Sequence, residues 1–198
     1  TTLVSNIAYS FSKLENSKVL LIDMDLRNPS IHKQFEKSNT YGLMDHLKND
    51  RPLDKCVSKI EENIDILTTG AIPPNPTEVL SSNKVATFLE DIKDHYDYIF
   101  IDSPPVGVVS DATVLSKIVD GVMFIVGANE TDLSHAEIAV ENLKKADANV
   151  IGAVLNKYEM KETSYSYYGY YYKQDATPGS RAARKKKKGL FGKLAGVR

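Results

Sequence analysis

The stretch VLLIDMDLRNP, residues 19–29, decides the fold class of this chain. Its first four residues are β-branched residues and leucines, which predict a buried strand that ends at Asp23. Asp25 lies two positions later, so both carboxylates can face one crevice if Asp25 has left the regular pleat. Two such groups can serve Mg²⁺ and a substrate hydroxyl in a phosphoryl-transfer site. An isolated Asp here is better explained as the start of a loop, so the pair needs support from elsewhere.

Similar strands recur along the chain, with helical segments between them. Short apolar runs predict further strands at residues 64–67, 98–101, 121–126 and 150–155. Amphipathic spacing predicts helices at residues 3–14, 42–47, 77–95, 111–117 and 133–146. This alternation predicts an α/β fold with a doubly wound, mostly parallel sheet that is covered on both faces.

A second predicted strand also ends in an acidic residue. Residues 98–105 read YIFIDSPP, in which the strand ends at Asp102 and Ser103 follows. This is a Walker B pattern, whose carboxylate holds Mg²⁺ or a water bound to it. Many buried strands end in Asp, so the pattern is weak by itself. Asp23, Asp102 and Asn156 all follow strand ends, however, and ligands bind parallel sheets at that edge. The fold and the chemistry therefore point to one crevice.

Thr1 and Thr2 begin the chain and lead into the first predicted helix. A phosphate-binding loop reads G-x-x-x-x-G-K-[ST] and also leads into a helix. If the chain begins just after the Lys of such a loop, Thr1 occupies the [ST] position of the motif. Thr1 is then a hydroxyl ligand of Mg²⁺. A Thr that simply caps a helix looks the same. The start has neither an initiator Met nor a signal peptide, which is expected of a fragment.

Residues 70–78, GAIPPNPTE, hold three prolines. Each proline fixes its own φ angle, so a stiff turn is expected before the helix at residues 77–95. We expect that helix to be capped near Asn75, with Pro76 at its first position. The rigidity of this segment follows from its residues, but its role does not.

Six of the eleven tyrosines lie close together, at Tyr165, Tyr167, Tyr168, Tyr170, Tyr171 and Tyr172. A core strand is disfavoured here, because every phenolic hydroxyl would need a buried partner. The cluster is either a set of phosphate acceptors on a flexible tail or an aromatic segment that binds partners. Composition alone does not decide between the two.

Four of these features occur together and in order, namely residues 21–29, 70–76, 101–105 and the tyrosine cluster at 165–172. In this combination residues 1–172 resemble the cytoplasmic kinase domain of the bacterial protein-tyrosine kinases (BY-kinases) that control capsular and exopolysaccharide synthesis. Partition and cell-division ATPases share the first and third features, whereas the proline motif and the tyrosine cluster favour the kinase. The fold that this resemblance implies is a P-loop NTPase of the deviant Walker (SIMIBI-like) class.

The resemblance implies a role for each matching residue. Thr1 matches the Walker A hydroxyl that binds Mg²⁺, and it belongs to the nucleotide site together with Thr2. Asp23 and Asp25 match the catalytic Walker A′ aspartates, and Asp23 is both near the metal and the candidate base for the tyrosine hydroxyl. Asp102 matches the catalytic Walker B aspartate, which also serves the metal.

The resemblance further implies ATP and Mg²⁺ as cofactors, and Asn156 matches the residue that contacts the adenine. An Asn that merely ends a strand explains Asn156 equally well. The family also implies autophosphorylation of the tyrosine cluster between subunits of a homo-oligomeric ring. It implies a membrane adaptor of the polysaccharide co-polymerase type as activator, a cognate tyrosine phosphatase, and a cytoplasmic location at the inner face of the plasma membrane.

Two other functions stay open at this point. One is a partition-type (Min/Par-like) ATPase switch, and the other is a non-catalytic scaffold whose tail recruits partners. The family's Gly-rich loop and its Lys are absent from residues 1–198, and these groups supply most of the phosphate binding. We therefore expect residues 1–198 alone to bind ATP poorly and to have little kinase activity.

The regular alternation of strands and helices stops after Lys157, which predicts a domain at residues 1–157 and a flexible tail at residues 158–198. The resemblance implies that the domain is a P-loop kinase domain without its phosphate loop. Cys56 is the only cysteine, so no internal disulfide can form, which fits a reducing cytoplasm. The net charge of -1 conceals a basic segment, residues 181–198, that has no acidic residue. This segment is either a solvated tail or a contact with an anionic membrane, and nucleic acid is a disfavoured partner.

Overall fold

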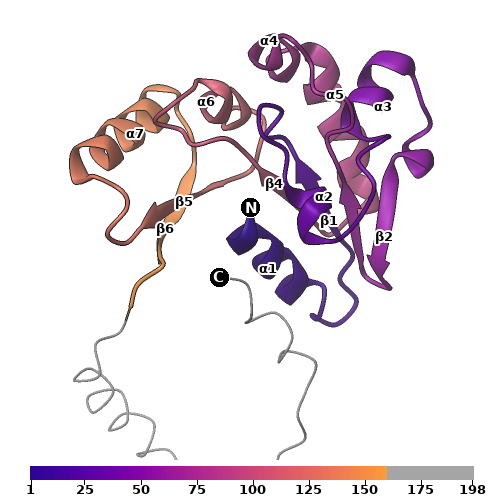
Figure 1. Ribbon diagram of the computed structural model, residues 1–198, viewed down its shortest axis with the longest axis horizontal. Helices are drawn as coiled ribbons and strands as arrows, with labels where there is room; N and C mark the ends of the chain where they lie inside the picture. The colour runs from indigo at the N-terminus through magenta and orange to yellow at the C-terminus, as the bar shows by residue number, and fades with distance from the viewer. Residues whose placement is uncertain (160–198) are drawn as a thin grey trace, which may run out of the picture. The chain divides into compact units, whose positions relative to one another are not determined.

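The strand predicted at residues 19–22 is β1 (Val19–Asp23), and it lies inside a four-stranded sheet with the strand order β2-β3-β1-β4. The structure is a computed structural model that describes residues 1–159 (Figure 1). The other strands of this sheet are β2 (Val57–Glu61), β3 (Ile64–Leu67) and β4 (Tyr98–Asp102). β3 and β4 run parallel to β1, as predicted, whereas β2 pairs antiparallel with β3.

Helices cover both faces of the four-stranded sheet. Those that pack on it are α1 (Thr2–Phe11), α2 (Ile31–Gln34), α3 (Leu43–Asn49), α4 (Pro76–Leu80) and α5 (Asn83–Ile92). Successive side chains of a strand point to opposite faces. Leu20 and Ile22 accordingly pack with residues of α3, α4 and α5, and Val19 and Leu21 pack with residues of α1 and α2. Every residue of β1 is buried, which explains its continuous apolar sequence before Asp23.

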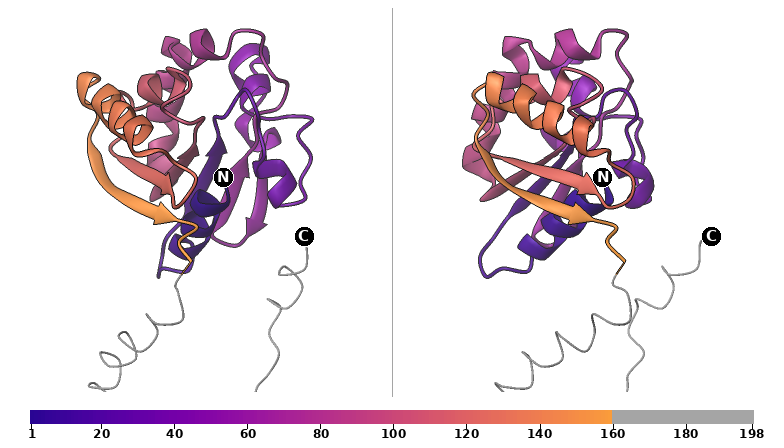
Figure 2. Two further views of the ribbon diagram at one scale, coloured as in Figure 1. Left: turned by 60° about the vertical axis from the view of Figure 1, so that its left-hand side comes forward. Right: turned by 90° about the vertical axis from the view of Figure 1, so that its left-hand side faces the viewer.

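The last two strands form a separate sheet. β5 (Val122–Gly127) and β6 (Val150–Asn156) are parallel, and α7 (Leu133–Lys145) runs along one face of the pair (Figure 2). Exposed apolar side chains on these two strands include Met123, Ile125, Val150, Ile151 and Leu155. Within residues 1–159, no strand pairs with the outer edge of β4 or with the free edge of β5. The strands therefore form two sheets rather than one continuous sheet.

Two local expectations differ from the structure. The helix predicted at residues 77–95 is broken at Ser81 and Ser82 into α4, α5 and a short 3₁₀ helix, η2 (Lys93–His95). The hydroxyls of both serines donate to carbonyls of the preceding turn, which competes with helix continuation. β2 was not predicted, because its sequence, VSKIE, alternates apolar and charged residues only weakly. Pro76 does begin α4, with Asn75 at the N-cap, as expected.

The remaining elements position the loops around the predicted crevice. The predicted helix at residues 111–117 is α6 (Asp111–Leu115), and a short 3₁₀ helix, η1 (Leu53–Lys55), precedes β2. Residues Thr1–Tyr158 form one compact unit. Within the described part of the chain, no helix has the length and apolar character needed to cross a membrane. The tyrosine cluster and the basic segment lie outside the described residues.

Candidate active site

Asp23 lies at the carboxyl end of β1, directly beside Asp102 at the end of β4. Its side chain is fully buried. One oxygen, Oδ2, accepts hydrogen bonds from the backbone N–H groups of Ser30 and Ile31, each at 2.9 Å. The other oxygen, Oδ1, has no hydrogen-bond partner in the structure. A buried oxygen without a partner is costly, so this atom is available to a ligand.

The surroundings of Asp23 make its carboxyl group a weaker acid than usual. Burial raises the pKa of Asp23 to about 6, because the charged form loses its hydration. The two backbone N–H groups of Ser30 and Ile31 oppose this change, and the nearby charges of Asp102 and Asp25 add to it. A carboxyl group with a pKa near neutrality can both accept and release a proton at physiological pH.

Thr1 connects the N-terminus of α1 to this pair of acids. Its hydroxyl donates to Asp102 Oδ2 at 2.6 Å and lies 2.7 Å from the Ser30 hydroxyl. Ser30 in turn donates its backbone N–H to Asp23. The structure therefore gathers Thr1, Asp23 and Asp102 at one edge of the sheet, as the sequence predicted. Their proposed roles in metal binding and catalysis stay predictions.

Asp25 has a different local environment. Its Oδ1 accepts from the backbone N–H groups of Arg27 at 3.2 Å and Asn28 at 3.0 Å, which forms an Asx turn. This turn shapes the loop between β1 and α2. Asp25 has therefore left the strand, as expected, and one of its oxygens is occupied by the loop backbone.

The residues that follow β3 contact the backbone of Asp23 and the start of α3. The Thr69 hydroxyl donates to the backbone carbonyl of Asp23 at 2.9 Å, and both groups are buried. Gly42, at the start of α3, packs so closely that a Cβ atom there would lie 2.2 Å from the carbonyl oxygen of Thr68. Gly70 has a φ angle of 76° and exchanges two hydrogen bonds with the side chain of Asn39. These contacts hold residues 68–70 in place, and Thr69 in turn holds the backbone of Asp23.

The remaining predicted residues lie outside this hydrogen-bonded group. Thr2 is the exposed first residue of α1. Asn156 ends β6 in the second sheet, and its side-chain oxygen accepts from the backbone N–H of Lys157 at 2.9 Å. The six predicted phosphate acceptors, Tyr165 to Tyr172, lie outside the described residues.

The residues at the sheet edge fit a magnesium ion. Mg²⁺ prefers oxygen ligands and keeps several of its waters, so one or two carboxylates are enough to hold it. Asp23 offers a buried oxygen without a partner, and Asp102 and the Thr1 hydroxyl lie beside it. No group of three or more His, Cys, Asp or Glu residues suited to a metal occurs in residues 1–159. These residues therefore fit a Mg²⁺ ion that keeps several of its waters, and not an ion coordinated by protein ligands alone.

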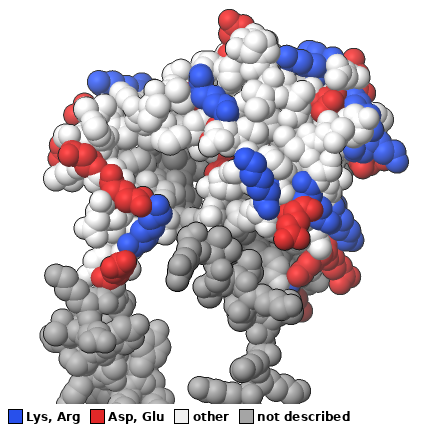
Figure 3. Space-filling view, in the orientation of Figure 1, with Lys and Arg blue, Asp and Glu red and all other residues white. Residues whose placement is uncertain are grey.

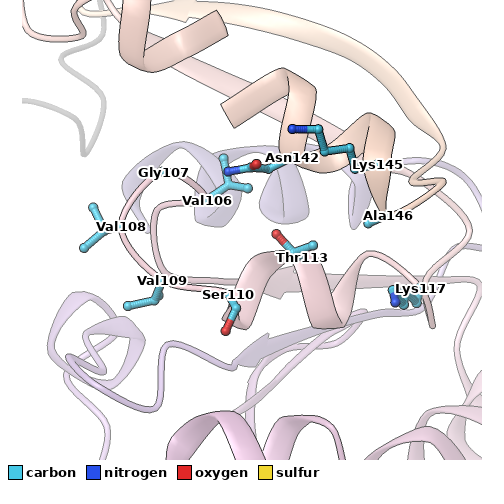
Figure 4. A pocket seen from close by; sticks show the side chains of 10 residues that line it. All are labelled: Val106, Gly107, Val108, Val109, Ser110, Thr113, Lys117, Asn142, Lys145 and Ala146. Atoms are coloured by element: carbon cyan, nitrogen blue, oxygen red, sulfur yellow. The ribbon is translucent and has the colours of Figure 1, made fainter. Parts of the chain in front are cut away.

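A separate surface cavity of about 460 Å³ lies between the loop after β4, α6 and α7 (Figure 4). Val106, Val108 and Val109 line one part of it, and Lys117 and Lys145 line another. Neither Asp23 nor Asp102 is among its lining residues. On the face shown in Figure 3, Lys and Arg side chains lie among Asp and Glu side chains, without a large area of one sign.

Comparison with known proteins identifies the family. A family model described as an AAA domain matches residues 1–130. The chain is 38% identical to CapB of Staphylococcus aureus over 174 residues, which are 87% of this chain and 75% of that protein. It is 35% identical to the tyrosine-protein kinase YwqD of Bacillus subtilis (strain 168), across 85% of this chain and 72% of that kinase. The chain belongs to the bacterial tyrosine-protein kinase family.

Solved structures of this kinase family have the same fold. The chimerical protein CapA2B2 matches with a TM-score of 0.77 and 31% identity, across 80% of this chain and 70% of that one. The septum site-determining protein MinD of Pyrococcus horikoshii, solved with Mg-ADP, matches with a TM-score of 0.66 and 24% identity. The match covers 81% of this chain and 66% of that one. The second match shows only that the fold is shared with cell-division ATPases. The predicted fold class and the resemblance to BY-kinases are thus confirmed.

Several residues around the site were not predicted from the sequence of this kinase. Ser30 joins Thr1 to Asp23, although it lies in a loop and has no sequence signal of its own. Arg27, Thr77 and Asp111 meet in one hydrogen-bonded cluster. Arg27 and Thr77 lie in segments quoted above, and Asp111 begins the helix predicted at residues 111–117. Their meeting depends on long-range packing, which no local pattern reports.

Proposed function

We propose that this kinase transfers the γ-phosphoryl group of ATP to tyrosine hydroxyls, including those of its own residues 165–172, and so regulates capsular or exopolysaccharide synthesis. The observation that carries the proposal is the grouping of Thr1, Asp23 and Asp102 at one sheet edge, with Asp23 Oδ1 buried and without a partner. The tyrosine-kinase names of similar proteins, such as YwqD, support the choice of tyrosine as acceptor.

The nucleotide is proposed to bind at the N-terminus of α1. The first N–H groups of a helix have no partner within the helix and attract phosphate oxygens. Thr1 is the N-cap of α1 and makes no side-chain capping bond, because its hydroxyl is directed to Asp102. Thr1 and Thr2 would thus face the phosphates, and Asn156 is proposed to contact the adenine. When Mg²⁺ binds with ATP, it neutralises phosphate charge, and Thr1, Asp23 and Asp102 are proposed to hold it or its waters.

Asp23 is the proposed general base. A tyrosine hydroxyl has an ordinary pKa of about 10, so it keeps its proton until its oxygen begins to bond to phosphorus. The proton then moves from the phenolic oxygen to Asp23 Oδ1 while the bond between the γ-phosphorus and the bridging oxygen of ADP breaks. Burial raises the pKa of Asp23 to about 6, so its carboxylate binds a proton more readily than an exposed Asp does. Asp25 is proposed to assist by shaping the loop.

The tail tyrosines are proposed to react in the site of a neighbouring subunit. This proposal follows the autophosphorylation between subunits that the resemblance to BY-kinases implies. We also propose a homo-oligomeric ring, a membrane adaptor as activator, a cognate phosphatase, and a place at the inner face of the plasma membrane. The basic segment at residues 181–198 is proposed to contact anionic lipid.

The experiment that tests this function measures phosphotyrosine and inorganic phosphate together. The full-length protein is incubated with Mg-ATP, and its tryptic peptides are analysed by mass spectrometry. We expect phosphate on tyrosines within residues 165–172, and its loss when all six are changed to Phe. Release of inorganic phosphate without any phosphotyrosine would instead identify a partition-type ATPase.

A further inference from the structure

Three loops at the carboxyl edge of the sheet meet through one buried carboxylate. Asp111, the first residue of α6, is fully buried. Arg27 donates from Nε to Asp111 Oδ2 at 2.7 Å and from Nη2 to Oδ1 at 3.3 Å. The Thr77 hydroxyl donates to Asp111 Oδ1 at 2.5 Å and accepts from Arg27 Nη2 at 2.9 Å. These residues belong to the loop after β1, the proline motif after β3 and the segment after β4.

In this cluster both carboxylate oxygens of Asp111 accept hydrogen bonds from Arg27 or Thr77. Burial raises the pKa of Asp111, but the hydrogen bonds from Arg27 and Thr77 outweigh burial, so its pKa is lowered from the ordinary value. The carboxylate is therefore ionised and depends on both partners. Removing one partner of a buried ion leaves a charge that the protein cannot solvate. The cluster consequently holds its three loops in one relative position.

The loop that carries Arg27 also carries the groups that orient Asp23. Asp25 ties the backbone of Arg27 and Asn28 into a turn. The same loop ends at Ser30 and Ile31, whose N–H groups donate to Asp23 Oδ2. A shift of the Arg27 side chain would therefore be passed along a short loop to both donors. An error of about 1 Å in the position of a reacting group can cost about 100-fold in rate.

We propose that Arg27, Thr77 and Asp111 form a positioning clamp for residues 24–31, which holds the Asp23 carboxylate in the orientation needed for phosphoryl transfer. The proposal rests on the function proposed above. It also assigns a role to the proline motif, because that motif fixes the start of α4 and so delivers Thr77 to the clamp. None of the three residues needs to touch ATP or the tyrosine.

The clamp is tested with Thr77→Val, which removes the hydroxyl but keeps the shape of the side chain. Thr77→Ser restores the hydroxyl, and Thr87→Val is the matched control, because Thr87 is exposed on α5. In the full-length protein we expect Thr77→Val to lower kcat about tenfold with the KM for ATP changed less than about twofold. Thr77→Ser should recover most of the kcat, and Thr87→Val should match the wild type.

Amide hydrogen exchange separates positioning from general stability. In the Thr77→Val chain, the amides of Ser30 and Ile31 should exchange about fivefold faster or more, while those of Leu21 and Ile22 in β1 stay unchanged. Equal acceleration at all four amides would mean that the cluster is merely structural, and the proposal would be dropped. Unchanged exchange at Ser30 and Ile31 would also overturn it.

Unchanged exchange at these two amides would mean that the buried Leu26 and Pro29 hold the loop without the clamp. If the wild type makes no phosphotyrosine, the proposed function fails, and the exchange pattern alone then decides whether the clamp orders the loop. The two failures are thus distinguishable.

Discussion

The two sheets of this kinase consist of the same kind of apolar strand, yet they are buried to very different degrees. All residues of β1 are buried, whereas the first four residues of β6 and Leu155 are exposed. Asp23 and Asp102 belong to the four-stranded sheet, where hydrogen bonds from Thr1, Ser30 and Thr69 hold their surroundings in place. The positions of the two candidate catalytic acids therefore depend on the four-stranded sheet and not on the β5–β6 pair.

The β5–β6 pair has the sequence of strands that are buried on both faces. Its exposed Ile125 and Ile151, together with the open edges of β4 and β5, are sites where a further strand or subunit can pack. We therefore expect the β5–β6 pair to gain order from additional contacts, whereas β1, inside the four-stranded sheet, is already fully buried. Substitutions matched between the two regions test this contrast.

The largest effect is expected from adding a methyl group at Gly42. The new Cβ atom would lie 2.2 Å from Thr68 O and 2.4 Å from Gly70 N, which are backbone atoms that cannot move aside cheaply. Gly42→Ala should therefore lower the free energy of unfolding by about 4 kcal/mol or more. Gly152→Ala in β6 is the matched control, because a Cβ there meets no atom within 4 Å, and it should change stability by less than about 0.5 kcal/mol. Urea denaturation measures the free energy of unfolding of both variants. Equal losses would contradict the expected difference between the two sheets.

A smaller difference is expected between two isoleucines. Ile22 is fully buried in β1, and Ile151 in β6 is 65% exposed. Ile22→Ala should cost about 3 kcal/mol through lost burial and the cavity left behind, and Ile151→Ala about 1 kcal/mol or less. The free energies of unfolding from urea titrations decide the matter. A cost at Ile151 as large as that at Ile22 would mean that β6 is covered in solution.

The pH dependence of stability gives the smallest of the three effects. The pKa of Asp23 is raised from 3.8 to about 6, so the folded protein binds the proton more tightly than the unfolded chain does. The contribution of Asp23 to stability is therefore fully present below pH 3.8 and is lost as the pH rises through 6. Asp23→Asn avoids burying the ionised group, so it should raise the free energy of unfolding by about 1–3 kcal/mol at pH 8 and by little at pH 4.

Urea titrations at the two pH values measure this effect. Glu141→Gln on the exposed surface of α7 serves as the control and should change stability by less than about 0.5 kcal/mol at either pH. If the Asp23→Asn protein is less stable than the wild type at pH 8, burial of the ionised Asp23 carboxylate does not carry the expected cost.

Strand periodicity predicted most of this fold, because buried parallel strands leave a strong apolar signal at residues 19–22, 64–67 and 98–101. The site acids were predicted because each follows such a strand. What the sequence did not reveal depends on contacts between distant residues. β2 pairs at a sheet edge with little burial, and the split of the strands into two sheets is a tertiary property.

The helix break and the clamp have the same kind of explanation. Ser81 and Ser82 end α4 through side-chain bonds that also occur within continuous helices, so their presence did not predict a break. Arg27 and Asp111 are 84 positions apart, and nothing in either local sequence indicates the partner. Residues of this kind are found only when the loops are placed in three dimensions.

The central claim is that the carboxylate of Asp23 receives the tyrosine proton at the carboxyl edge of the four-stranded sheet. The most direct test compares phosphotyrosine formation by the full-length wild type, Asp23→Asn, and Asp91→Asn as an exposed control on α5. We predict that Asp23→Asn lowers the phosphotyrosine signal at least about 100-fold although its fold is no less stable, and that Asp91→Asn has no effect. An unchanged signal in Asp23→Asn would remove Asp23 from the mechanism and contradict the account.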